Sequence, residues 1–166
     1  MRATVRLELR NAAGSVIDVR HAKNSVMKGG AQLIANLFSG QATTGITHMV
    51  VGLSGDPESD PFSSTALTTT GGTPDALTGG NETAIIPADF IIKTDAVKRL
   101  VIVQLHATLP PPAGVGTLRE AGLISKVAAQ TTLYNRVTFA PIEKQNDHEL
   151  TMFWEVTFPY GDLNWM

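Results

Sequence analysis

The chain has 166 residues, and its 13 Lys and Arg against 15 Asp and Glu give a formal net charge of −2. This balance provides neither a basic field that would attract phosphate groups nor an acidic tail, so nucleic acid is not an expected partner. The sequence contains no cysteine, which excludes disulfides, zinc–thiolate sites, iron–sulfur clusters and cysteine nucleophiles.

The first twenty or so residues predict a β-hairpin. Val5, Leu7 and Leu9 alternate with charged residues, which is the period of two of a half-buried strand. "NAAG" supplies a turn, and the alternation returns from Val16 to His21. This start lacks the apolar run of a secretory signal, and no stretch of the chain is long and apolar enough to span a bilayer. We therefore expect a soluble cytoplasmic product with no signal peptide and no membrane insertion.

The next segment, "NSVMKGGAQLIANLFSG", predicts the one good helix of the chain. Asn24 or Ser25 can cap its start and Gly40 can close its end, while two early glycines weaken the first turn. The regular helix is predicted from about Gly30 to Ser39. Its apolar residues fall on one helical stripe, formed by Val26, Leu33, Ile34, Leu37 and Phe38.

A short apolar strand, "ITHMVVGLS", is followed by a sharp change in composition. From Ser54 to Thr83 the chain is dominated by Ser, Thr, Gly, Pro and Asp, which predicts a long loop. Loops of this length usually bind, pack or remain disordered rather than simply connect elements. Because its apolar residues are few, chiefly Phe62, Leu67 and Leu77, we expect it to be mobile in the isolated subunit and ordered by a neighbouring chain.

The remainder of the chain predicts more strands. These are "TAIIPADFII", "KRLVIVQLHATL", "TLREAGLIS", "TTLYNRVTF" and "HELTMFWEVTF", separated by proline-rich or turn-rich connections. The predicted fold class is mainly β: a β-sandwich-like antiparallel architecture of about seven or eight strands, with one short α-helix and one long loop. We expect a single domain over residues 1–166, with a short C-terminal extension at 159–166.

The stretch "NDHELTMFWEVTF" combines three ionisable residues with aromatic ones, which raises the question of a catalytic or metal site. Consecutive residues of a strand point to opposite faces, so Asp147, His148 and Glu149 cannot all converge on one ion or substrate without an irregular backbone. A turn that enters a core strand is the better interpretation. In that strand the inward face is formed by Leu150, Met152, Trp154, Val156 and Phe158.

Other patterns give equally little support for catalysis. The four histidines lie in separate segments without the spacing of a metal site, and no nucleotide-binding or hydrolase motif is present, so we expect no catalytic residue, metal or cofactor. Arg119 and Arg136 could bind an anion. We instead interpret them as structural cations that bridge across strands to Glu120, Glu149 or Glu155.

The order of these segments resembles a family of proteins. An Asn before a glycine-containing helix, an "ITHMVVGLS" strand, a Ser/Thr-rich loop, "REAGL", "LYNRVTF" and a closing "EKQNDHELTMFWEVTF" look like small β-rich structural proteins of tailed-phage tails and related contractile injection particles. The resemblance spans about Asn24 to Phe158. The extension "FPYGDLNWM" and the length of the loop depart from that pattern.

The resemblance implies a non-enzymatic component of the tail, collar, baseplate or fibre region. Such a protein is made in the bacterial cytoplasm, assembles into a virion or injection particle, and has other copies of itself and neighbouring particle proteins as partners. The alternative is a carbohydrate-binding or receptor-binding β-sandwich, in which the long loop and exposed aromatics would contact a glycan. A hydrolase that uses Asp147, His148 or Glu149 is the third and least supported hypothesis.

The candidate interface residues come from the long loop and the C-terminal extension. Aromatic and thioether side chains are enriched where proteins meet, although such a tail can also fold back to cover an edge of its own sheet. The candidates are Phe62, Leu67, Tyr160, Leu163, Trp165 and Met166.

Overall fold

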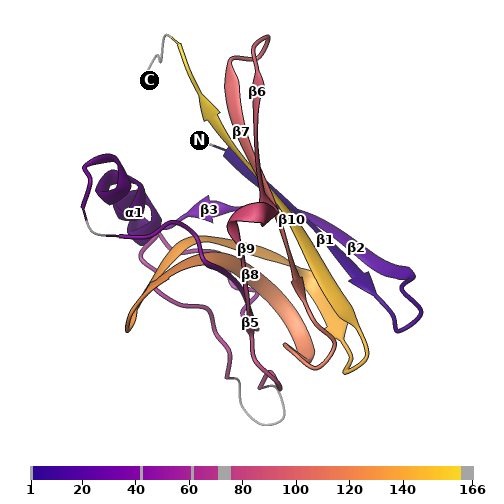
Figure 1. Ribbon diagram of the computed structural model, residues 1–166. Coiled ribbons are helices and arrows are strands. Elements are labelled where there is room, and N and C mark those ends of the chain that lie inside the picture. The colour runs from indigo at the N-terminus through magenta and orange to yellow at the C-terminus, as the bar shows by residue number, and fades with distance from the viewer. Residues whose placement is uncertain (1, 42, 61, 71–75, 162–166) are drawn as a thin grey trace.

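The computed structural model describes residues 2–41, 43–60, 62–70 and 76–161, which form two antiparallel sheets of five strands each (Figure 1). Sheet 1 has the strand order β2-β1-β10-β7-β6, and sheet 2 has the order β3-β9-β8-β4-β5. The predicted mainly β, sandwich-like fold is confirmed. The elements are β1 (Arg2–Arg10), β2 (Val16–Lys23), β3 (Ser25–Val26), α1 (Lys28–Phe38), β4 (His48–Gly52), β5 (Glu82–Ala84), the 3-10 turn η1 (Pro87–Asp89), β6 (Phe90–Asp95), β7 (Leu100–Leu109), β8 (Gly116–Val127), β9 (Gln130–Lys144) and β10 (Glu149–Pro159).

The described strands number ten rather than seven or eight. One additional strand is β3, which has only two residues. The other arises because the segment predicted as one strand, "TAIIPADFII", is divided by η1 into the three-residue β5 and β6. An alternating pattern needs at least four residues to be recognised, so strands this short carry no signal of their own.

The inner faces of the two sheets enclose a common apolar core. In sheet 1, β10 lies between β1 and β7, and its register places Met152 opposite Leu7 and Trp154 opposite Val5. Trp154 is 1% exposed. The prediction that this segment is a core strand is therefore confirmed, because its alternate residues Leu150, Met152, Trp154 and Val156 are all buried.

The helix begins earlier than predicted. It spans Lys28–Phe38, its N-cap residue is Met27, and neither Asn24 nor Ser25 caps it. Ser25 and Val26 instead pair with β9 as β3, so the chain leaves a sheet only two residues before the helix starts. The first helical N–H, from Lys28, is satisfied by a carbonyl of the long loop at 2.8 Å rather than by a local side chain.

Glycines fix the two ends of α1 for different reasons. A Cβ at Gly30 would stand 2.1 Å from the carbonyl oxygen of Tyr134, so the close approach of the helix to β9 requires a residue without a side chain. At the other end Gly40 has φ +69, and the bonds from Gly40 to Leu37 and from Gln41 to Asn36 form a Schellman motif. The predicted closing role of Gly40 is confirmed.

The segment predicted as a long loop is tied to the body at several points. At its end lies β5, which pairs with β4. Leu67 packs on a small cluster formed by Met27, Val50, Ile124 and Leu133, and Leu77 packs on the main core. The segment is expected to be mobile because it contains few apolar residues. These contacts do not test that expectation.

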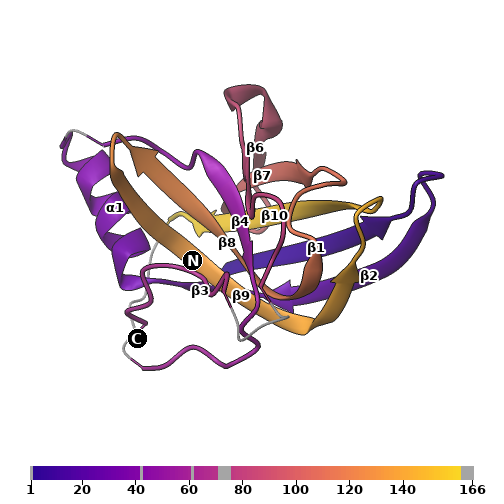
Figure 2. The ribbon, with the colours of Figure 1, turned by 90° about the horizontal axis from the view of Figure 1, so that it is seen from below.

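The hairpin of β6 and β7 projects from the body of the molecule, together with the end of β10 in Figure 1 and by itself in Figure 2. The inner face of sheet 1 thus extends past the area that sheet 2 covers. No helix within the described ranges is long and apolar enough to cross a membrane.

Candidate functional site

The ionisable residues before β10 form a turn. The Gln145 N–H donates to Nδ1 of His148, the His148 N–H donates to the Gln145 carbonyl, and Glu149 then begins the strand. His148 and Asp147 approach each other at 3.7 Å, at a site where the Asp147 side chain is 64% exposed. The interpretation as a turn that enters a strand is confirmed. Among the described residues no three His, Asp or Glu side chains are grouped so as to hold a metal ion.

A buried ion-pair network lies under the long loop. The carboxylate of Glu120, 1% exposed, accepts from Nε of Arg136 at 2.6 Å and from the backbone N–H groups of Thr68 at 2.7 Å and Ser54 at 3.2 Å. Arg136 also pairs with Glu58 at 3.2 Å, where both side chains are less than 10% exposed. The predicted structural role of Arg136 is confirmed for its partner Glu120. The network fastens the loop to sheet 2.

A second buried cation holds the proline-rich connection between β7 and β8. The Lys144 ammonium donates to the carbonyls of Pro110 and Pro111, each at 2.9 Å. Burial lowers the pKa of Lys144 to about 8, and nearby Glu149 acts in the opposite direction. The side chain is 1% exposed, so it stabilises a turn and is not accessible to a substrate.

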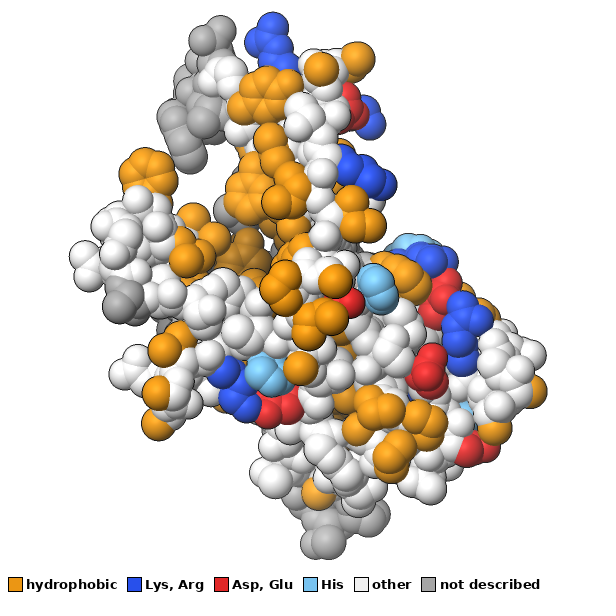
Figure 3. All heavy atoms as spheres, viewed as in Figure 1, with side chains coloured by type: hydrophobic (Ala, Val, Ile, Leu, Met, Phe, Trp, Pro, Cys, Tyr) orange, Lys and Arg blue, Asp and Glu red, His pale blue; other side chains and the backbone are white. Residues whose placement is uncertain are grey.

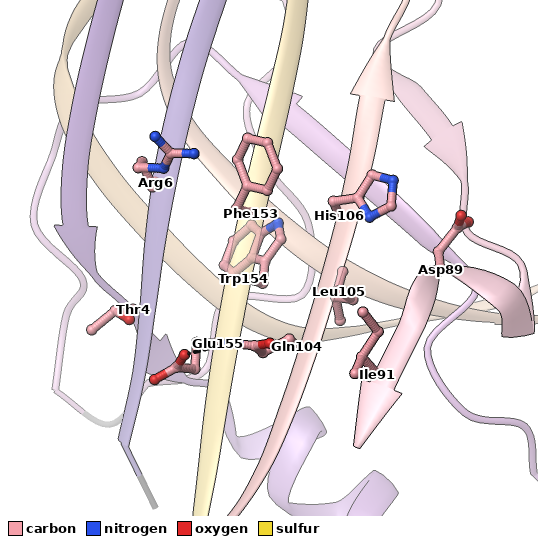
Figure 4. A pocket seen from close by; sticks show the side chains of 10 residues that line it. All are labelled: Thr4, Arg6, Asp89, Ile91, Gln104, Leu105, His106, Phe153, Trp154 and Glu155. Atoms are coloured by element: carbon pink, nitrogen blue, oxygen red, sulfur yellow. Dashed lines mark hydrogen bonds between the residues drawn. The ribbon is translucent and has the colours of Figure 1, made fainter. Parts of the chain in front are cut away.

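A cleft on the outer face of sheet 1 has a volume of about 410 Å³ (Figure 4). We call it the outer trough. It runs between two cross-strand rows: Arg6, Phe153 and His106 form one, and Glu155 and Gln104 belong to the other. Its full lining is Thr4, Arg6, Asp89, Ile91, Gln104, Leu105, His106, Phe153, Trp154 and Glu155.

Planar groups stand side by side in the first row. The guanidinium carbon of Arg6 lies 4.7 Å from the ring centroid of Phe153, a cation–π contact. The imidazole of His106 flanks the same ring with centroids 6.2 Å apart and planes inclined by 26°. Arg6 also pairs with the buried carboxylate of Glu8 at 2.5 Å. Glu8 also pairs with Arg10 at 2.7 Å, so the two arginines share one carboxylate.

The second row offers hydrogen-bonding groups. Nε2 of Gln104 donates to one carboxylate oxygen of Glu155 at 2.9 Å. Asp89, at the edge of the trough, accepts the Ile86 N–H at 2.8 Å through one oxygen. Among the described residues, no hydrogen bond occupies the second oxygen of either carboxylate or either ring nitrogen of His106. The trough can therefore bind a ligand through polar groups placed around one aromatic ring.

Sequence reasoning missed the outer trough. The one indication of it in the sequence is Phe153, an aromatic residue on the face of the strand that otherwise carries Thr151, Glu155 and Thr157. Apart from Phe153 and its neighbours Trp154 and Glu155, the lining residues come from segments distant in sequence, and only the sheet order β1-β10-β7-β6 brings them together.

A different surface lies on the inner face of sheet 1, between α1 and the projecting hairpin. Apolar side chains gather in this recess in the space-filling view (Figure 3). We call it the apolar groove. Its volume is about 90 Å³ and no charged residue lines it. The lining is Leu33, Ile34, Leu37, Gly45, Ile46, Phe90, Val103, Leu105, Leu123, Tyr134, Val156 and Phe158.

The helical stripe predicted from the sequence faces this groove only in part, and most of it is not buried. Leu33 is 3% exposed, whereas Ile34 is 36%, Leu37 44% and Phe38 94% exposed. On the hairpin Ile92 is 71% exposed. Within the helix the predicted stripe is therefore buried only at Leu33. Helix α1 packs on β9 at its start, and its later turns extend over an uncovered part of sheet 1.

The candidate interface residues lie in several places. Phe62 is 40% exposed with φ +57, and its carbonyl accepts the Lys28 N–H. Leu67 is half-buried against its own chain, as described above. Tyr160 is 42% exposed and donates its N–H to the Arg99 carbonyl at the tip of the hairpin. Leu163, Trp165 and Met166 lie outside the described residues.

Comparison of the chain with models of known protein families, with curated proteins and with solved structures found no match.

Proposed function

We propose that the protein is a non-enzymatic structural subunit of a phage tail or contractile injection particle, which acts by self-association or by docking to neighbouring particle proteins. The observation that carries the proposal is the apolar groove together with the exposed residues beside it. Large apolar patches that remain exposed on one chain usually mark a surface that another protein covers.

The composition of this surface supports a protein partner. Ile34 and Leu37 line the groove and are 36% and 44% exposed, and no charged residue is among the lining residues. The centres of protein interfaces are depleted in charged residues and enriched in aromatic ones, as this surface is. The order of segments that resembles tail and injection-particle proteins supplies the class of assembly.

Two experiments test the proposal. The first is quantitative mass spectrometry of virions or injection particles purified from the bacterium that encodes the chain, which should contain it at a constant copy number per particle. Its absence from such particles would contradict the particle role.

The second experiment is native mass measurement of Leu37→Asp. A charge in the wall of the groove should reduce assembly while the melting temperature stays near that of the wild type, because Leu37 is already 44% exposed. Ile17→Asp is the matched control, since Ile17 is 48% exposed on β2, outside the groove. Equal effects of the two variants would exclude the groove as the contact surface.

A further inference from the structure

The outer trough and the contact surface proposed above lie on opposite faces of sheet 1 and share one lining residue, the buried Leu105. In β10, Phe153 and Glu155 point into the trough, whereas Val156 and Phe158 line the groove. A ligand in the trough would leave the groove free. The volume of about 410 Å³ also falls within the range of sites that bind small molecules.

Its shape and chemistry indicate a particular class of ligand. The floor is an open sheet face with one aromatic ring, Phe153, which can pack against an apolar C–H face. Around the ring stand a carboxylate, an amide and an imidazole, contributed by Glu155, Gln104 and His106. Such groups both donate to and accept from hydroxyls, which carry a donor and an acceptor on one atom.

The charged residues that line the trough narrow the class of ligand further. The one guanidinium in the lining, that of Arg6, pairs with Glu8, a carboxylate that Arg10 shares. The other charged groups in the lining are the carboxylates of Asp89 and Glu155. Because the two carboxylates of the lining outnumber its one guanidinium, an uncharged ligand is favoured over an anionic one.

We propose that the outer trough binds neutral pyranose units of an oligosaccharide, with one sugar ring packed against Phe153 and its hydroxyls bonded to Glu155, Gln104 and His106. The proposal locates glycan binding on the sheet rather than on the long loop. It goes beyond the structural role and does not depend on it, since a chain that never assembles could still bind sugar through this face.

The test is an array of neutral and uronic-acid oligosaccharides, followed by titration of the full chain with the neutral trisaccharide that binds best. Phe153→Ala and Phe153→Leu should each weaken binding by about tenfold or more, because Leu keeps the bulk but not the aromatic face. Circular dichroism confirms that the variants fold. Phe62→Ala is the matched control: Phe62 is an exposed aromatic of the long loop, and its removal should leave affinity unchanged.

Three results would overturn the proposal. They are the absence of binding to any neutral oligosaccharide at millimolar concentration, a preference for the uronic-acid members of the array, and a loss of affinity in Phe62→Ala with none in the Phe153 variants. None of these results bears on assembly, which the Leu37 variant measures separately.

Discussion

Removal of the Glu120 side chain should be among the most damaging single changes in this protein. Glu120→Ala leaves the Arg136 guanidinium, 7% exposed, with Glu58 as its remaining carboxylate partner, and it removes the acceptor for the N–H groups of Ser54 and Thr68. Breaking a buried ion pair from one side costs about 3 to 5 kcal/mol. Glu58 still compensates part of the Arg136 charge, while the N–H groups of Ser54 and Thr68 lose their acceptor and add to the cost. We expect a loss of that size in the free energy of unfolding.

Urea denaturation measures the loss, and limited proteolysis locates it. Because Glu120 fastens the segment at both 54 and 68, the variant should be cut faster within residues 54–70 while the rest of the chain stays protected. Glu82→Ala is the control, since its ion pair with Lys126 has both side chains 35% exposed and should cost less than about 1 kcal/mol. A cost for Glu120→Ala as small as that of the control would refute the reasoning, as would unchanged cleavage of the segment.

Three further predictions concern the core, a buried cation and the helix. Trp154→Ala should lower the free energy of unfolding in urea by about 3 to 5 kcal/mol. Trp154→Phe should lower it much less, because the indole N–H has no hydrogen-bond partner among the described residues. Equal losses for the two variants would contradict this. Because the pKa of Lys144 is about 8 in the folded protein and its ordinary value is 10.5, the unfolded chain binds more protons between those values, and stability relative to Lys144→Met should rise with pH from about 8 to 10. A difference that stays flat over that range would show that the lysine keeps its ordinary pKa. Gly30→Ala should lower the melting temperature by several degrees, because its Cβ would clash with the Tyr134 carbonyl. Gly29→Ala should lower it far less, because its Cβ would lie 3.3 Å from its nearest neighbour. Similar shifts in melting temperature for the two variants would contradict this reasoning.

The strands that the sequence predicts correctly are those with a long alternating pattern. In β1 and β10 the apolar residues recur at every second position, and both strands bury them as expected. The helix boundaries are less predictable. The turn before α1 depends on the pairing of Ser25 with Arg136, a contact between residues more than a hundred positions apart that no local propensity encodes.

The two candidate surfaces were harder to predict than the fold. A period of two indicates that residues share a face, but it does not state which strands become neighbours, so the row of Arg6, Phe153 and His106 follows only from the sheet order. The apolar groove raises the opposite difficulty. An apolar stripe such as Leu33, Ile34 and Leu37 looks the same in sequence whether its own chain or another chain covers it.

The central position of β10 in sheet 1 has a consequence for the order in which the chain can fold during synthesis. The hairpin β1–β2 and the hairpin β6–β7 are joined in the sheet only through β10, which leaves the ribosome after both of them. The hairpin β8–β9 pairs locally and belongs to the other sheet, so it can form before β10 emerges. Until residues 149–159 emerge, the two earlier hairpins expose unpaired edges and apolar faces, and this nascent intermediate is the stage at which the protein is most prone to aggregate.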